Sequence, residues 1–130
     1  MKHHKFSVSS ANTLAGVDNR LRDIAIKALE LSKVDFGIPS SGGMRTAEQQ
    51  NKLYHNGKSQ LDGYDKKSYH QTGRALDVYA FVDGKASWDK SHLTTIAAAM
   101  LQAANELGHN LEWGGHWVNF VDMPHFQIPE

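Results

Sequence analysis

The sequence predicts a small single domain of the α+β class, in which a mostly antiparallel sheet packs with helices. Residues 17–32 and 91–107 carry apolar side chains at three- and four-residue spacing, which is typical of amphipathic helices. Between these segments, strand-forming residues and an Asp-Gly turn predict a β-hairpin over residues 74–87. The chain contains no repeat and no interdomain linker, so we expect residues 1–130 to form one domain.

Capping residues as well as periodicity indicate the first two helices. Asp18 is placed to cap the helix over residues 17–32. The glycines and serines of "SSGGMRT" then mark a sharp connection. Thr46 and Gln49 have the spacing of a capping box, which predicts a second helix through about residue 56. The polar residues 58–67 that follow predict a surface loop.

The expected hairpin begins in "ALDVYAF", a stretch rich in strand-forming residues, and turns at "VDGK". Because successive side chains of a strand point to opposite faces, Asp77, Tyr79 and Phe81 would share one face. This places a carboxylate in line with two aromatic rings.

The longest apolar stripe predicts a third helix from Asp89 or Ser91 to Leu107, ended by Gly108. Downstream of it, aromatic and apolar residues alternate around a Gly-Gly pair. Pro124 in this segment predicts either an edge strand or the start of a strand, since proline cannot donate to a ladder.

Charge and composition exclude several classes of protein. Lys+Arg and Asp+Glu number 14 each, so the formal net charge is zero and nucleic-acid binding is not expected. The absence of cysteine excludes disulfides, thiolate zinc sites and a cysteine nucleophile. No apolar stretch reaches signal-peptide or membrane-spanning length, so we expect a protein made in the cytoplasm without stable membrane insertion.

Histidine and acidic residues in two parts of the chain could converge on one cation. His70 precedes a glycine in a polar loop, Asp77 lies in the strand that follows, and His125 stands in "DMPHFQ". Three such donors are the number that a catalytic zinc ion usually takes from a protein. Asp122, close to His125 but not necessarily a ligand, is placed to accept a proton from an activated water.

Spacing alone leaves this assignment open. A His and an Asp a few residues apart are usually a satisfied polar pair or surface residues. His116 and His109 could equally be proposed as ligands, although His109 follows a helix-ending glycine and is more often solvated there. Trp113 and Trp117 are more often core or pocket wall than part of a special motif.

Two longer motifs carry a family resemblance. "SYHQTGRALD" resembles the S-x-H-x-x-G-x-A-x-D signature of the VanY-type zinc D-alanyl-D-alanine peptidases, and "DMPHF" resembles their second signature. "GMRTAEQQNKLY" is similar to an earlier segment of that family. The "EWGGHW" stretch before "DMPHFQ" is most similar to the branch of phage endolysins and bacterial enzymes that cleave the L-alanyl-D-glutamate bond of peptidoglycan.

The resemblance implies the compact α+β fold of the Hedgehog signalling domain and the D,D-peptidases. It implies that His70, Asp77 and His125 bind Zn²⁺ and that Asp122 is the general base. Further residues are implied either in catalysis or as groups that contact the substrate or support the ligands: Arg45, Ser68, Trp113, His116 and Trp117.

The function that follows from the resemblance is that of a phage endolysin, a zinc-dependent endopeptidase that hydrolyses the L-alanyl-D-glutamate bond of stem peptides and lyses the host. We expect a monomer without a separate cell-wall-binding domain, released from the host cytoplasm to the periplasmic peptidoglycan through holin-type membrane holes. A D-alanyl-D-alanine carboxypeptidase and a non-hydrolytic zinc-binding module of the same fold are the alternatives.

Overall fold

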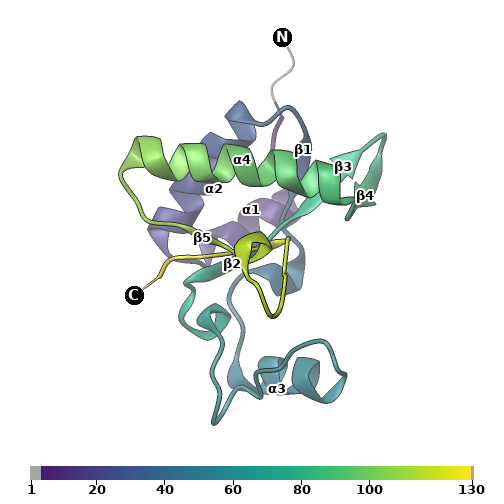
Figure 1. Ribbon diagram of the computed structural model, residues 1–130, viewed down its shortest axis with the longest axis vertical. Helices are drawn as coiled ribbons and strands as arrows, with labels where there is room; N and C mark the ends of the chain where they lie inside the picture. The colour runs from purple at the N-terminus through teal and green to yellow at the C-terminus, as the bar shows by residue number, and fades with distance from the viewer. Residues whose placement is uncertain (1–3, 130) are drawn as a thin grey trace.

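The structure, a computed structural model, describes residues 4–129 and has the expected α+β architecture (Figure 1). The α-helices of this part of the chain are α1 (Val8–Ala15), α2 (Asn19–Leu31), α3 (Ala47–His55) and α4 (Lys90–Leu107). The strands are β1 (Asp35–Gly37), β2 (Ala75–Asp77), β3 (Tyr79–Val82), β4 (Lys85–Ser87), β5 (Glu112–Trp113) and β6 (His125–Gln127). The described residues also form three short 3₁₀ helices, η1 (Ser40–Gly42), η2 (Tyr69–Thr72) and η3 (Gly114–His116).

Helices α2 and α4 pack together and supply most of the helical side of the core. Their inward faces are fully buried at the periodic positions, among them Leu21 and Ile24 of α2 and Ile96 and Met100 of α4. Figure 1 shows α4 lying across the upper part of the molecule and α3 at the opposite end of its long axis. Helix α3 therefore lies away from the α2–α4 core, where its residues can line a functional site.

The strands form two three-stranded antiparallel sheets rather than one, with strand orders β1-β3-β4 and β2-β6-β5. The hairpin expected over residues 74–87 is therefore limited to β3 and β4, while β2 pairs with β6. The reason lies at Val78, whose N–H donates to the carbonyl of Pro124 at 3.0 Å and keeps this part of the chain beside β6. Asp77 consequently lies in a different sheet from Tyr79 and Phe81, which corrects the prediction of one shared face.

The predicted turns and caps are otherwise confirmed. Asp83 and Gly84, the two central residues of the β3–β4 turn, both have positive φ, as a type I′ turn requires. Asp18 caps α2, and Thr46 forms the expected capping box with Gln49. Helix α4, which corresponds to the helix predicted up to Leu107, has Asp89 as its N-cap and Gly108 as its C-cap.

Helix α1 was not predicted, because only Ser10 and Leu14 of its eight residues are buried and the apolar periodicity is weak. Pro124 immediately precedes β6, which is the central strand of its sheet, so the strand-start alternative is right and the edge-strand alternative is wrong. Within residues 4–129, no helix combines the length and the apolar character that crossing a membrane requires.

Replacing Asp18 by alanine is expected to destabilise the protein by about 1 kcal/mol near pH 7, because the α2 N-terminus loses its cap. The Asp18 carboxylate accepts hydrogen bonds from the backbone and guanidinium of Arg20. The side-chain hydrogen bond from Arg20 lowers the pKa of Asp18 from 3.8 to about 2. The contribution of the ionised group is therefore complete above the unfolded-state pKa and falls as the pH drops from 3.8 toward 2.

Urea unfolding of the wild type and of Asp18→Ala at about pH 7 and about pH 3 measures this effect. The difference in stability should shrink at the lower pH. Asp18→Asn is the matched control, since asparagine caps a helix without a charge. A difference that is the same at both pH values would show that the ionised carboxylate does not contribute.

Candidate metal centre and active site

His70 is fixed in the interior by the 3₁₀ helix η2. The side chain of Ser68 caps this helix by accepting the backbone N–H of His70 at 3.2 Å, and Gly73 ends it with a φ of 73°. The His70 ring is only 2% exposed, and its Nδ1 lies 2.9 Å from the carbonyl oxygen of Gly43. Ser68 thus acts on His70 through the backbone, and Gly73 makes the tight turn that leads into β2.

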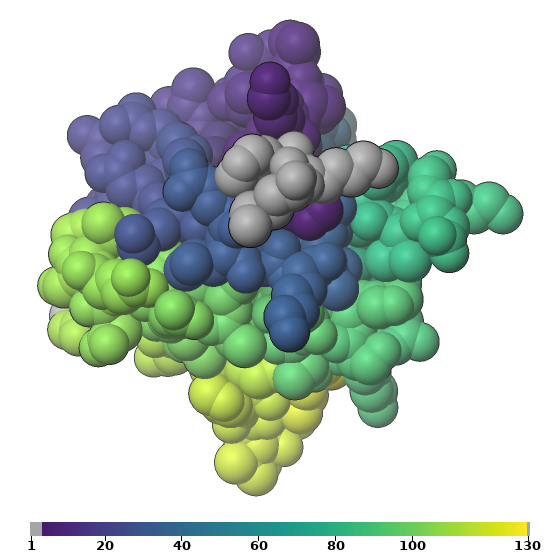
Figure 2. Space-filling model, turned by 90° about the horizontal axis from the view of Figure 1, so that it is seen from above, coloured from purple at the N-terminus to yellow at the C-terminus, as the bar shows by residue number. Residues whose placement is uncertain are grey.

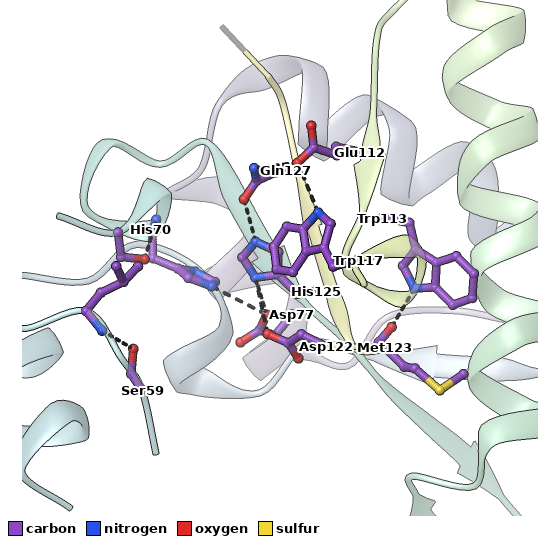
Figure 3. A network of polar contacts seen from close by, with 12 residues as sticks. Ser59, His70, Asp77, Glu112, Trp113, Trp117, Asp122, Met123, His125 and Gln127 are labelled. Carbon is purple, nitrogen blue, oxygen red and sulfur yellow. Dashed lines mark hydrogen bonds and ion pairs between the residues drawn. The ribbon is translucent and has the colours of Figure 1, made fainter. Parts of the chain in front are cut away.

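Strand pairing brings Asp77 and His125 together from positions 48 residues apart. The two residues are direct partners in the β2–β6 register, with Asp77 Oδ1 3.1 Å from His125 Nδ1. The same carboxylate oxygen lies 3.4 Å from His70 Nε2. Figure 3 shows the three side chains converging, and one potential ligand atom from each lies within 4.8 Å of the others. The predicted set His70, Asp77 and His125 is therefore one cluster that could hold a metal ion.

Arg45 closes one side of this cluster. Its guanidinium donates to Asp77 Oδ2 at 3.0 Å, to the amide oxygen of the fully buried Gln50 at 3.1 Å, and to the carbonyl of Ser41 at 2.8 Å. Burial lowers the pKa of Arg45, while the charge of Asp77 opposes this effect. Arg45 is thus held by three acceptors and faces the cluster as a fixed positive charge.

The electrostatics of the cluster favour an ionised Asp77. Burial by itself would raise the pKa of Asp77, but hydrogen bonds from His125 and His70 and their charges hold it well below its usual range. For His125, burial would lower the pKa, and the hydrogen bond and charge of Asp77 raise it above 6.5. An anionic oxygen between two imidazoles is a suitable donor set for a divalent cation.

Asp122 lies beside the cluster but farther from it. Its Oδ2 is 4.0 Å from His125 Nδ1, and its backbone N–H donates to the carbonyl of Gly114 at 3.0 Å. A Cβ on Gly114 would come within 2.2 Å of the Asp122 carbonyl oxygen, so only glycine permits this approach. Burial, followed by the charge of Asp77, raises the pKa of Asp122. A carboxylate of raised pKa near the cluster suits proton transfer.

The cluster opens into a cleft of about 620 Å³. Trp117 and Phe120, from the segment between η3 and β6, line one part of it, and Figure 2 shows the yellow C-terminal segment projecting from the body of the molecule. Residues of α3 and of the following loop also line the cleft, including Leu53 and the exposed Lys58 and Lys67. Apolar walls with cationic groups suit a peptide that carries carboxylates.

The aromatic residues singled out in the sequence separate into different places. Trp117 lines the cleft, and its ring centroid lies 5.1 Å from that of His125. Trp113 does not line it: the ring packs in the core, 8% exposed, and Nε1 donates to the carbonyl of Met123 at 2.7 Å. His116 is exposed and packs edge-on against Trp113, outside the cleft lining. Trp113 therefore supports the loop before β6, and substrate contact by Trp113 or His116 has no support in this geometry.

Sequence reasoning missed three polar residues of the site: Gln50, Glu112 and Gln127. Gln127 lies 2.8 Å from His125, and its own amide is hydrogen-bonded to Glu112. The position of Gln127 two residues after His125 was a usable signal, because residues i and i+2 of a strand lie on one face. The roles of Gln50 and Glu112 depend on contacts between separate elements, so no pattern in the sequence indicates that they belong to the site.

The fold and the site together define a hydrolase-like arrangement, with a candidate metal cluster and a carboxylate beside it at the edge of a peptide-sized cleft. The chain belongs to the phage L-alanyl-D-glutamate peptidase family, whose model matches residues 2–127. This membership confirms the resemblance seen in the motifs and the class of enzyme that it implied.

Relatives from phages and bacteria support the assignment. The L-alanyl-D-glutamate peptidase of Escherichia phage T5 is 39% identical over 114 residues, which cover 87% of this chain and 81% of that protein. The peptidoglycan L-alanyl-D-glutamate endopeptidase CwlK of Bacillus subtilis (strain 168) is 30% identical over 115 residues, 80% of this chain and 67% of that protein. The crystal structure of the Serratia marcescens L-Ala D-Glu endopeptidase ChiX superposes with a TM-score of 0.86 at 35% identity, covering 98% of this chain and 92% of that one.

Proposed function

We propose that this protein is a zinc-dependent phage endolysin that hydrolyses the L-alanyl-D-glutamate bond of peptidoglycan stem peptides. The observation that carries the proposal is the cluster of His70, Asp77 and His125 with Asp122 at 4.0 Å from His125 Nδ1. Membership in the phage L-alanyl-D-glutamate peptidase family supports the choice of bond.

The hydrogen bonds around the two histidines support metal binding. A metal-ligating histidine usually donates its second ring N–H to an oxygen acceptor, which fixes the ring and its tautomer. Nδ1 of His70 faces the carbonyl oxygen of Gly43 at 2.9 Å, and Nε2 of His125 faces the amide oxygen of Gln127 at 2.8 Å. The other nitrogen of each ring is directed at Asp77. His70 Nε2, Asp77 Oδ1 and His125 Nδ1 would therefore hold the ion.

Zinc at this position would act as a Lewis acid. It would lower the pKa of a bound water toward neutrality and polarise the scissile carbonyl. Asp122 accepts the proton of the attacking water and then delivers it to the departing amine of D-glutamate. The C–N bond breaks as the new C–O bond is retained, leaving an alanine carboxylate and a free glutamate amine. Arg45 provides fixed positive charge beside the reacting carbonyl, and its three hydrogen bonds keep it oriented.

Mass spectrometry of soluble fragments from purified Gram-negative peptidoglycan tests the proposed bond. The zinc-loaded protein is expected to expose new alanine C-termini and glutamate N-termini, and Asp122→Ala is expected to release neither. Release of free D-alanine alone would instead assign a D-alanyl-D-alanine carboxypeptidase. Intact peptidoglycan after incubation with a zinc-loaded sample would favour a non-hydrolytic zinc-binding module.

Chelation is expected to reduce hydrolysis to background, because Lewis acidity would be lost from the cluster. Turbidity of a peptidoglycan suspension measures the rate after treatment with excess chelator and after its replacement by zinc or by magnesium. Zinc should restore the rate, and magnesium should not, since imidazole ligands suit zinc and magnesium prefers oxygen. Hydrolysis that continues undiminished in excess chelator would remove the metal from the mechanism.

We also propose that the protein acts as a monomer and reaches the peptidoglycan from the host cytoplasm through holin-type membrane holes. The candidate ligand set is complete within one chain, so the proposed site requires no residue from a second copy. Expression inside a Gram-negative bacterium is expected to leave the cells intact until the inner membrane is permeabilised, after which the culture should clear. Lysis without permeabilisation would show that the protein leaves the cytoplasm by another route.

A further inference from the structure

A chain of hydrogen bonds lies behind His125, on the side away from Asp77 (Figure 3). Nε2 of His125 is 2.8 Å from Gln127 Oε1, and Gln127 Nε2 donates to Glu112 Oε1 at 3.0 Å. The same Glu112 oxygen accepts the indole N–H of Trp117 at 3.2 Å. Strand pairing positions the two middle residues, because Glu112 of β5 is the direct partner of Gln127 of β6.

The chemistry of these groups fixes the direction of each hydrogen bond. An ionised carboxylate only accepts, so the NH₂ group of Gln127 must face Glu112. The amide oxygen of Gln127 must then face His125, and it can only accept a hydrogen bond. Nε2 of His125 is therefore the donor to Gln127. The ionised Asp77 also accepts, so in the metal-free protein it competes for the ring proton from the Nδ1 side. When Nε2 keeps the proton, Nδ1 has the lone pair that a metal ion requires.

We propose that Glu112 and Gln127 are positioning residues that select the metal-binding tautomer of His125 and tie it to the wall of the substrate cleft. This inference rests on the proposed function, in which His125 Nδ1 is a zinc ligand. Gln127 acts on His125 directly, and Glu112 acts by preventing the Gln127 amide from flipping.

The link to the cleft passes through Trp117. Its indole lines the cleft, and its ring lies 5.1 Å from that of His125 between centroids. Because one oxygen of Glu112 holds both Trp117 and Gln127, the cleft wall and the tautomer of a metal ligand share an anchor. Loss of Glu112 should consequently disturb substrate binding and zinc binding together, whereas loss of the indole N–H alone should disturb substrate binding.

Zinc affinity, measured by competition with a chromophoric chelator, tests the proposal apart from activity. Gln127→Leu is expected to weaken zinc binding by roughly 10–100-fold, the usual effect of removing a partner behind a metal ligand. Glu112→Ala should weaken it in the same direction. Glu112→Gln should retain most of the affinity, because an amide oxygen still accepts both hydrogen bonds. Trp117→Phe should leave zinc affinity unchanged and raise KM.

A matched control is Glu106→Ala on α4, an exposed glutamate whose nearest cation, Lys27, lies 3.9 Å away; it should leave zinc affinity unchanged. Zinc affinities of Gln127→Leu and Glu112→Ala within about twofold of the wild type would overturn the proposal. Equal losses in Glu112→Gln and Glu112→Ala would overturn the role given to the shared oxygen acceptor.

Nitrogen-15 NMR of the His125 ring in the metal-free protein, at a pH where the ring is neutral, reads the tautomer directly. The wild type should show a larger share of the tautomer protonated at Nε2 than Gln127→Leu, in which Asp77 still attracts the ring proton to Nδ1 and Gln127 no longer holds it on Nε2. A wild-type protein that binds no zinc would contradict the proposed function, yet the NMR measurement would still decide the role of Gln127. The same tautomer populations in the wild type and in Gln127→Leu would overturn this role even if zinc binds.

Discussion

Asp122→Asn is expected to keep its zinc and its fold while kcat for peptidoglycan hydrolysis falls by roughly 10²–10⁴-fold. The asparagine amide matches the carboxylate in shape but cannot accept a proton from water and return it to the leaving amine. Zinc should remain because Asp122 is not one of the three residues whose potential ligand atoms all lie within 4.8 Å of one another, His70, Asp77 and His125. Metal content by mass spectrometry and initial rates on labelled peptidoglycan measure the two effects separately.

The matched control is Asp23→Asn, which removes an exposed carboxylate from α2, away from the cleft lining. It should leave both the rate and the zinc content unchanged. If the zinc content of Asp122→Asn falls as far as that of His125→Ala, Asp122 is a ligand and not the proton carrier. If the rate of Asp122→Asn stays near that of the wild type, another group accepts the proton.

Asp77→Asn is expected to lose both zinc and hydrolysis, with activity at background. Asp77 is the anionic member of the cluster, and its Oδ1 lies near both imidazoles. Its Oδ2 also neutralises Arg45, whose side chain is 12% exposed. Breaking a largely buried ion pair from one side leaves a charge without its partner, so the metal-free variant should also be less stable, by about 3 kcal/mol.

The stability effect separates the two tasks of Asp77. Urea unfolding of the metal-free wild type, of Asp77→Asn, of Arg45→Met and of the double variant gives the coupling between the two residues. The double variant should be more stable than the sum of the two single losses predicts. Additive losses would mean that the Arg45–Asp77 pair makes no net contribution, and wild-type zinc affinity in Asp77→Asn would remove Asp77 from the ligand set.

Much of the local structure was predictable because its causes are local. The caps Asp18, Thr46 and Asp89 and the glycine that ends α4 lie where the sequence predicts them, since each acts on backbone groups of its own helix. Helix α1 was not predicted, because its burial comes from packing against other elements and not from a strong apolar period.

The candidate ligands were found from motifs, but their contacts were not. The two signatures indicate His70, Asp77, His125 and Asp122 as site residues, and the structure brings all four together. The sequence did not reveal that Ser68 caps the helix that carries His70. It also did not reveal that the Trp113 ring packs in the core while Trp117 lines the cleft. A side chain's direction depends on its neighbours across the fold, which spacing does not encode.

The sequence by itself determined the α+β class, the capped helices, the family and the donor types available for a metal. Only the tertiary structure decided that the strands divide into two sheets, that Arg45 pairs with Asp77, and that Glu112 stands behind Gln127 and His125. Helix periodicity and caps involve residues only a few positions apart, so a short stretch of sequence is enough to predict them. Strand pairing joins residues as far apart as Asp77 and His125, and packing of the whole chain selects which pairs form.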